Sequence, residues 1–432
     1  MPASDPASPV TLDIRDRIAV VTIDSPPVNA LGHAVRSGVM DALEKAEADD
    51  GIDAVVIRGG GRCFSGGADI REFGTPPAEP TLRQLCARAE NFPKVVVAAL
   101  HATAFGGGLE LPLSCHYRIA DASAQIALPE VKLGIVPGSG GTQRLPRIIG
   151  AKRALKVILS GDPFSAQEAL DLGVLDAIVD GDLTDAAVAY AKKLVADGAA
   201  LRKVRDLSVA DADAEVFAEA RKTWEKRSRG LLAPLACIDC VEIAATQPFD
   251  EGMEREREIF VSCRDSEQSK AQRHLFFAER EAAKVKDVPR DTQKRSISTA
   301  AVVGCGTMGG GIAMCLANVG IPVTVLETSE DALNAGLAKI EKNYAATVSK
   351  GRLAQAAMDT RMGLITGTTT YADLGMADIV IEAVFEDMDL KKTIFGELDK
   401  VMKPGAVLAT NTSTLDIDEI AAATKRPQDV IG

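Results

Sequence analysis

The sequence predicts an α/β protein in which two α/β regions flank a helical one. Short apolar runs alternate with segments of helical period from residue 10 to about residue 180. The strand signals then stop, and a fresh strand-helix-strand pattern starts at residue 298. We therefore expect three parts: an α/β core at residues 1–190, a helical extension with a linker at 191–295, and a second α/β domain at 296–432.

The composition supports several domains and excludes some classes of protein. A chain of 432 residues is too long for one compact core. It is 46% hydrophobic and 25% charged, as globular proteins are. The net charge of -12 argues against a general binder of nucleic acid or anionic membranes. From this charge we expect no nucleic-acid partner. No apolar run approaches the roughly 20 residues that span a bilayer, so we also expect no membrane span.

The first region should contain buried strands and short helices. The pattern of residues 10–24 and 52–58 (IDAVVIR) predicts buried strands, with a helical stretch near 33–49 between them. Residues 94–100 (KVVVAAL) form another apolar run. This run leads into a glycine triplet and then into a helix that carries Glu110.

The helical region carries dense charge. Segments such as DEGMEREREIF and AQRHLFFAERE predict helices whose charged faces are solvated. We expect the apolar face of this region to pack between the flanking domains. Residues 286–296 (KDVPRDTQKRS) are polar and contain a proline, which favours a linker.

The eight cysteines are thinly spread, which is typical of reduced thiols in a cytosol-like compartment. Cys237 and Cys240 form a lone CxxC with no second pair at zinc spacing. Packing within a helix is therefore favoured over a redox or metal role, and we expect no metal site.

Glu110 and Glu130 are the strongest candidates for catalysis. Each stands in apolar sequence, AFGGGLELPL and AQIALPEVKLGIVPG, where a carboxylate is out of place. Acids are rarely buried without a partner, and burial raises their pKa. Two such carboxyls in a dry, glycine-lined pocket are suited to moving protons.

Two glycine-rich loops supply backbone N–H groups beside these acids. CFSGGADI (63–70) follows a strand, and Gly106, Gly107 and Gly108 open a helix. N–H groups at a helix start are unpaired and carry partial positive charge. Two of them from separate loops can hold a thioester oxygen as it gains negative charge.

These motifs resemble the crotonase (enoyl-CoA hydratase/isomerase) superfamily. The resemblance rests on PPVNAL, FSGGADI, GGGLEL, CHYRIAD and ALPEVKLGIVPGSGGTQRLPRIIG, in that order, over roughly residues 10–190. It implies a crotonase-type spiral fold. It also implies that the N–H groups of Ala68 and Gly107 form the oxyanion hole, and that Glu110 and Glu130 are the two catalytic acids.

Having both acids points to hydration of a 2-enoyl-CoA. We assign the protonation of Cα to Glu130 and the deprotonation of water to Glu110, and the reverse assignment stays open. Two alternatives stay open: a Δ3,Δ2-enoyl-CoA isomerase, which needs one carboxyl, and a non-catalytic NAD-binding scaffold. The resemblance implies acyl-CoA thioesters as partners, with coenzyme A as part of the substrate. It leaves open a monomeric chain and an association with a thiolase.

A second motif indicates a dinucleotide site. Gly304, Gly306 and Gly309 form GxGxxG between a predicted strand and a predicted helix, and Glu327 ends the next strand. The glycines permit a tight turn, the approach of a pyrophosphate and close helix packing. An acid at the position of Glu327 binds ribose hydroxyls, which favours NAD over NADP.

The segments VIEAVFEDMDLKK and LATNTSTL resemble the NAD domain of 3-hydroxyacyl-CoA dehydrogenases, which implies a Rossmann-type fold. By this resemblance Glu386 and Lys391 lie along the cofactor and Ser413 lies near the substrate carbonyl. Without the resemblance, Lys391 would be interpreted as an exposed helix lysine. For Glu382, a structural role at the end of a strand is the alternative to a role in the site.

The family's catalytic histidine follows a segment like RPQDVIG, with which this chain ends. We therefore expect that histidine beyond Gly432, in a longer protein. The whole arrangement resembles multifunctional β-oxidation enzymes, of which the loop motifs favour the peroxisomal type and its bacterial relatives. We expect a bacterial cytoplasmic protein, or a peroxisomal one if the source is eukaryotic.

Overall fold

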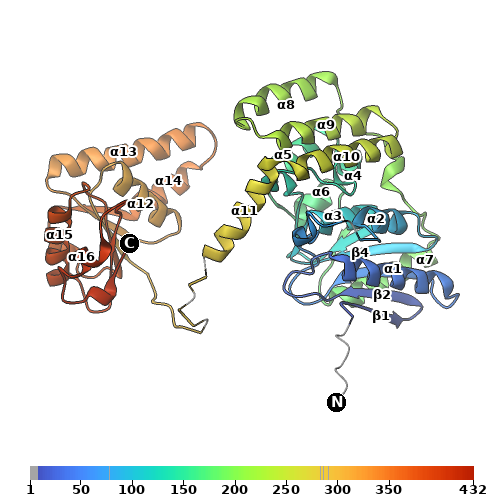
Figure 1. Ribbon diagram of the computed structural model, residues 1–432, viewed down its shortest axis with the longest axis horizontal. Helices are drawn as coiled ribbons and strands as arrows, with labels where there is room; N and C mark the ends of the chain where they lie inside the picture. The colour runs from blue at the N-terminus through green and yellow to red at the C-terminus, as the bar shows by residue number, and fades with distance from the viewer. Residues whose placement is uncertain (1–7, 77, 283, 286, 290) are drawn as a thin grey trace, which may run out of the picture. The chain divides into compact units, whose positions relative to one another are not determined.

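The computed structural model describes residues 8–76, 78–282, 284–285, 287–289 and 291–432 (Figure 1). It divides into two compact units, residues 1–285 and 286–432. Each unit has its own sheet and its own hydrophobic core.

A six-stranded sheet with the order β1-β2-β3-β4-β6-β9 forms the centre of the first unit. Only β1 pairs antiparallel with its neighbour, and the other neighbours are parallel. A smaller sheet has the order β5-β7-β8. The strands are β1 (Val10–Arg15), β2 (Ile18–Ile23), β3 (Ala54–Gly59), β4 (Val95–Leu100), β5 (Thr103–Phe105), β6 (Tyr117–Ala120), β7 (Gln125–Ala127), β8 (Phe164–Ser165) and β9 (Ala177–Ile178).

Helices cover both faces of the large sheet. One face packs against α7, and the other packs against α1 and the helices beyond it. The α-helices are α1 (His33–Ala48), α2 (Leu82–Glu90), α3 (Gly107–Ser114), α4 (Gly141–Ile149), α5 (Ala151–Ser160), α6 (Ala166–Asp171), α7 (Leu183–Ala196), α8 (Ala214–Arg227), α9 (Leu232–Thr246), α10 (Phe249–Asp265) and α11 (Glu267–Ala282). Short 3-10 turns are η1 (Ile70–Glu72), η2 (Glu130–Leu133) and η3 (Val204–Asp206).

The expected single strand over residues 10–24 is wrong. The chain reverses at Asp16 and Arg17, which have φ of 49° and 68°, and it forms a hairpin of β1 and β2. β2 is buried, whereas most of β1 is exposed because it forms the edge of the sheet. The turn residues Asp16 and Arg17 are polar, but β-branched residues on both sides of them gave the pattern of one continuous strand.

The helices of the extension belong to the first unit. α9 contacts α4, α5, α8 and α10, and Figure 1 shows this group gathered together. Cys237, Val241 and Phe260 of α9 and α10 join the same buried cluster as Phe64 and Leu109 of the α/β part. The apolar face expected between flanking domains therefore lies in the core of the first unit.

A buried ion pair joins α2 to α4. The Nε and Nη2 atoms of Arg144 each lie 2.9 Å from an oxygen of Glu90. Both side chains are almost completely buried. The two parallel hydrogen bonds satisfy charges that would otherwise be costly to bury.

The second unit is a doubly wound layer structure. Its sheet is entirely parallel, with the order β12-β11-β10-β13-β14-β15. The order reverses direction beside β10, and ligands of such sheets bind at this point. The strands are β10 (Ala300–Val303), β11 (Val323–Leu326), β12 (Ile365–Thr368), β13 (Ile379–Glu382), β14 (Val407–Thr410) and β15 (Val430–Ile431).

Helices lie on both faces of this sheet. The helices α12, α13 and α14 pack on one face, and α15 and α16 pack on the other. Their bounds are α12 (Thr307–Asn318), α13 (Glu330–Ser349), α14 (Gln355–Gly363), α15 (Met388–Val401) and α16 (Ile417–Ala421), with 3-10 turns η4 (Tyr371–Leu374) and η5 (Pro427–Asp429). Among the residues that the structure describes, no helix has the length and apolarity to cross a membrane.

Replacing Glu90 by Ala is expected to lower the free energy of unfolding of the first unit by about 3–5 kcal/mol, because Arg144 is left buried without its partner. Denaturant unfolding followed by fluorescence of Trp224 measures this, since the chain's single tryptophan lies on α8 of that unit. The control is Glu47→Ala, which breaks a more exposed pair with Arg88 of α2 and should cost about 0–1 kcal/mol. Equal losses in the two variants would contradict the prediction.

Candidate active site and cofactor site

Glu110 is a buried carboxylate held by backbone N–H groups. It stands in the first turn of α3 and is 3% exposed. Its Oε1 atom accepts hydrogen bonds from the N–H groups of Ser139 at 2.7 Å and Gly141 at 2.9 Å. Burial raises the pKa of Glu110, while these two bonds act in the opposite direction. The hydrogen bonds therefore favour the ionised form in a place that otherwise disfavours it.

Glu130 is buried without such support. It begins η2, and its Oε2 atom has no hydrogen-bond partner among the residues that the structure describes. Burial, and after it the charge of Glu110, raises the pKa of Glu130 well above its usual value. The two acids thus differ in kind: one is arranged for a negative charge, and the other is arranged to keep its proton.

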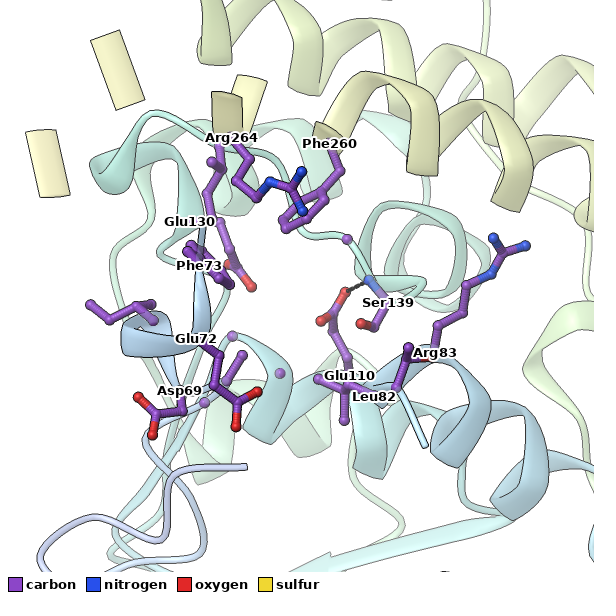
Figure 2. A pocket seen from close by; sticks show the side chains of 18 of the residues that line it. Asp69, Glu72, Phe73, Leu82, Arg83, Glu110, Glu130, Ser139, Phe260 and Arg264 are labelled. Atoms are coloured by element: carbon purple, nitrogen blue, oxygen red, sulfur yellow. Dashed lines mark hydrogen bonds between the residues drawn. The ribbon is translucent and has the colours of Figure 1, made fainter. Parts of the chain in front are cut away.

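Both acids line one cavity of about 730 Å³. Figure 2 shows Glu110 and Glu130 on opposite sides of it, with their carboxyl groups directed into the same space. A Cβ atom at Gly106 would lie 2.9 Å from Oε1 of Glu130, so the chain passes close to this carboxyl. The walls combine these acids with apolar side chains, among them Phe73, Leu82 and Phe260.

Two free N–H groups face each other beside the acids. Ala68 lies in the loop after β3, and Gly107 begins α3, and both line the cavity. A Cβ atom at Gly107 would lie 3.1 Å from the nitrogen of Ala68. Within the described part of the chain, neither N–H donates a hydrogen bond. The structure therefore brings together the four residues Ala68, Gly107, Glu110 and Glu130.

Asn29 holds the loop that presents Ala68, and sequence reasoning gave it no role. It is buried with φ of 52°, and its amide donates to the carbonyls of Gly60, Cys63 and Phe64. Its Oδ1 atom accepts from the N–H of Ser25. The segment PPVNAL contains this residue, so the signal was an asparagine in a turn that is set by two prolines.

Glu256 is a third buried acid that sequence reasoning missed. It lies on α10 and is completely buried, so the interpretation of this helix as a purely solvated charged face is wrong at this position. Its neighbours in the buried stripe are Gly252, Met253, Phe260 and Cys263. These residues recur at helical spacing, and that periodicity was the signal that places Glu256 inside.

The glycine-rich loop of the second unit is built for close contact. Gly304 has φ of +95°, and a Cβ atom at Gly309 would lie 1.8 Å from its carbonyl oxygen. No atom lies within 4 Å of a Cβ built at Gly306, among the described residues, so this side of the loop is open. α12 begins directly after Gly306, and its N-terminal N–H groups suit a pyrophosphate.

The acid that ends β11 contacts the same loop. Glu327 accepts hydrogen bonds from the N–H groups of Cys305 at 2.7 Å and Thr328 at 3.0 Å. The structure thus places Glu327 beside the glycines. The loop glycines and this acid fit a bound dinucleotide, because a tight turn, an open backbone and a ribose-binding carboxylate occur together.

Lys391 is fully buried, contrary to the exposed position that the residue type alone suggests. Its ammonium lies 2.8 Å from both oxygens of Glu382, which is also fully buried, and 3.5 Å from Glu386. Glu386 accepts from the N–H of Ser413 at 2.7 Å, and bonds chiefly from Thr412 lower the pKa of Glu386 to about 2. The structure therefore brings Glu386, Lys391 and Ser413 together at one end of the sheet.

The CxxC pair lies in the core. Cys237 and Cys240 face inward on α9, and burial raises the pKa of both thiols well above the usual value. Helix packing is therefore confirmed. Among the described residues, no group of three or more histidine, cysteine or acidic side chains could hold a metal ion.

Comparison with known families identifies the first unit. Residues 13–229, half of the chain, match the model for enoyl-CoA hydratase/isomerase. The chain belongs to this family. Residues 299–432 match the model for the NAD binding domain of 3-hydroxyacyl-CoA dehydrogenase. The expected crotonase-type and Rossmann-type folds, and the presence of a hydratase/isomerase domain followed by a dehydrogenase NAD domain, are thereby confirmed.

Two curated relatives match nearly the whole chain. A peroxisomal bifunctional enzyme of Danio rerio is 42% identical over 97% of this chain and 58% of its own length. The peroxisomal bifunctional enzyme of Homo sapiens is 39% identical over 97% of this chain and 59% of its own. A carnitinyl-CoA hydratase structure from Mycobacterium avium is 30% identical over 64% of this chain and 97% of its own, with a TM-score of 0.48. The hydratase/isomerase chain thus spans less than two thirds of the two bifunctional relatives.

Replacing Gly309 by Ala is expected to weaken NAD binding at least about tenfold, because the new Cβ atom would displace the Gly304 carbonyl on which the loop is built. Gly311→Ala is the matched control: it lies on the same helix, and its Cβ atom meets no described atom within 4 Å. Titration with NADH followed by fluorescence measures both. Equal affinities of the two variants for NADH would contradict the prediction.

Proposed function

We propose that the first unit adds water to the double bond of 2-trans-enoyl-CoA thioesters to give 3-hydroxyacyl-CoA. The observation that carries the proposal is the unequal pair of buried acids on one cavity. Glu110 has two N–H donors, and Glu130 has none on its Oε2 atom. A base and an acid on the same cavity are what addition of water across a double bond requires.

Each acid has one step. Glu110 accepts a proton from a water molecule whose oxygen bonds to C3, and Glu130 gives its proton to C2. The product then carries the hydroxyl on C3 and the new proton on C2. Glu110 has gained a proton and Glu130 has lost one, so a proton passes from Glu110 to Glu130 before the next turnover. The resemblance to enoyl-CoA hydratases favours syn addition, which requires both carboxyls to face the same side of the double bond.

The N–H groups of Ala68 and Gly107 stabilise the charge that forms between these steps. As the water attacks C3, negative charge moves to the thioester oxygen. Two unpaired N–H groups in a dry cavity hold such an oxygen, and losing one donor of this kind costs roughly 3–4 kcal/mol. The N–H of Gly107 also belongs to the start of α3, which adds its partial positive charge.

The cavity suits an anionic thioester. Arg83, Arg257 and Arg264 line it together with the acids. Their guanidinium groups favour the phosphates of coenzyme A as part of the substrate, since arginine binds phosphate through paired N–H donors. The apolar part of the wall, including Leu133 and Ile135, suits an acyl chain.

For the second unit we propose NAD-dependent oxidation of the 3-hydroxyacyl-CoA product, in the complete protein. Bound NAD supplies a hydride acceptor. Gly304, Gly306 and Gly309 would hold its pyrophosphate and Glu327 its ribose. Glu386 and Lys391 would lie along the cofactor, with Ser413 near the substrate carbonyl. The buried Glu382 holds Lys391 in place for this role.

The same first cavity would also support Δ3,Δ2-enoyl-CoA isomerisation, because Glu130 alone can carry a proton between two carbons. Comparing 3-enoyl with 2-enoyl substrates separates the two activities. The names of the relatives favour a peroxisomal site of action if the source is eukaryotic, and a bacterial source would favour the cytoplasm.

Replacing Glu110 or Glu130 by Gln is expected to lower kcat for hydration of crotonyl-CoA by about 100- to 10,000-fold, the usual contribution of acid–base catalysis. Binding of butyryl-CoA, which cannot be hydrated, should persist and shows that the cavity is intact. Asp162→Asn is the control, because Asp162 is exposed and pairs with Lys132 of η2, the turn that begins with Glu130. Wild-type turnover in either Gln variant would rule out the assigned roles.

The pH dependence of kcat/KM for hydration should be bell-shaped. Activity falls as pH drops through the pKa of Glu110, which burial raises, so this limb lies above the range of an ordinary glutamate. It falls again as pH rises through the pKa of Glu130, which burial and Glu110 raise well above the usual value. The two limbs belong to the pair because the carboxyls interact. An initial-rate profile that stays flat wherever the protein is folded would contradict this assignment.

A further inference from the structure

The turn that binds Glu110 is held from its other side by Glu256. Helix α10 carries Glu256 against the start of α4, where this side chain is completely buried. Its Oε1 atom accepts from the N–H of Gly140 at 2.8 Å, and its Oε2 atom accepts from the hydroxyl of Thr142. None of the steps proposed for hydration uses this acid.

Donors along this turn alternate between the two carboxyls. The N–H groups of Ser139 and Gly141 point to Glu110, and the N–H of Gly140 points to Glu256. The turn therefore lies between two acids from different helices, α3 and α10. A shift of the turn toward either acid would lengthen the hydrogen bonds to the other.

The backbone of the turn leaves little room for such a shift on the side of α10. Gly140 has φ of +101°, and a Cβ atom there would lie 3.2 Å from Sδ of Met253 on α10. A Cβ atom at Gly252 of α10 would lie 2.4 Å from Oε1 of Gln143. Helix α10 is thus in close contact with the start of α4, and Glu256 is its polar contact with the turn.

Stability alone does not explain an acid at this position. Burial, and after it the charge of Glu110, raises the pKa of Glu256 to about 8. A buried acid must still give up its water, whereas an apolar side chain of similar volume has none to lose. Retaining a third acid beside two others is therefore costly unless its hydrogen bonds serve the site.

We propose that Glu256 is a positioning residue for hydration: through the N–H of Gly140 and the hydroxyl of Thr142 it sets the turn that orients the carboxylate of Glu110. The inference rests on the proposed hydratase function. It makes the helical extension a part of the active site rather than a cover over it.

The test compares Glu256→Leu, Glu256→Gln and Thr142→Val in the full chain, with crotonyl-CoA as substrate. Glu256→Leu should lower kcat per folded protein by about 10- to 100-fold, as misplacement of a catalytic group by about 1 Å does. Its KM should change little, because the thioester contacts are untouched. Glu256→Gln should rescue most of kcat, since the amide oxygen can accept from Gly140 and the amide N–H can donate to Thr142.

Thr142→Val removes one of the two contacts and should lower kcat in the same direction by a smaller factor. Glu256→Leu combined with Thr142→Val should be no slower than Glu256→Leu alone, because Glu256→Leu already removes the contact with Thr142. The matched control is Glu258→Gln, an exposed acid of the same helix, which should leave kcat unchanged. Thermal unfolding is recorded for every variant.

A lower unfolding temperature with unchanged kcat per folded protein in Glu256→Leu would overturn the positioning role, because stability would then be its only effect. If Glu256→Leu does not fold, unchanged kcat in Thr142→Val would overturn it equally. Wild-type protein that does not hydrate crotonyl-CoA would instead overturn the proposed function itself, and the inference with it. The wild-type assay therefore separates the two failures.

Discussion

The first unit depends on how it keeps negative charge inside a dry core. A carboxylate costs several kcal/mol to bury unless donors replace its water. Here the donors are backbone N–H groups at the start of α4, which have no partner within their own helix and carry part of its dipole. Helices α3, α4 and α10 meet at this turn, and the buried pair of Arg144 and Glu90 anchors α4 from behind. The position of the start of α4 therefore determines where a carboxylate can be buried beside the pocket.

The second unit solves the same problem with side chains. Lys391 and Glu382 are both removed from water, and each compensates the other within a network that includes Thr410 and the N–H of Val384. The pair ties the end of β13 to the start of α15. The loop after β14 is in turn tied to this point through Glu386. These contacts lie beside the glycine loop, since a Cβ atom at Gly304 would lie 2.9 Å from the carbonyl oxygen of Ala383.

Much of this was visible in the sequence, for physical reasons that differ by site. Acids in apolar runs, such as Glu110, stand out because burial of charge is rare. The GxGxxG motif stands out because Gly304 has a left-handed backbone and Gly309 has no room for a side chain. The hairpin at Asp16 was hidden because strand propensity does not mark where a strand turns. Glu256 was hidden because it lies among acids that face water, and only the periodicity of its apolar neighbours separates it from them. The burial of Lys391 depends on a partner nine positions away, across a strand end and a loop, and local pattern does not reveal such pairs.

The placement of α10 bears on how such a chain could arise by gene fusion. The extension between the two α/β regions looks like a spacer, since it is charged and helical, yet it adds Phe260 to the cavity wall and Glu256 to the turn. A crossover between unrelated genes just after β9 would leave the α/β part without the Phe260 wall of its cavity and without the Glu256 contact to the turn. A breakpoint in the polar segment that follows α11 would keep both halves whole. A fusion of the two parts is therefore expected to keep the extension together with the first unit.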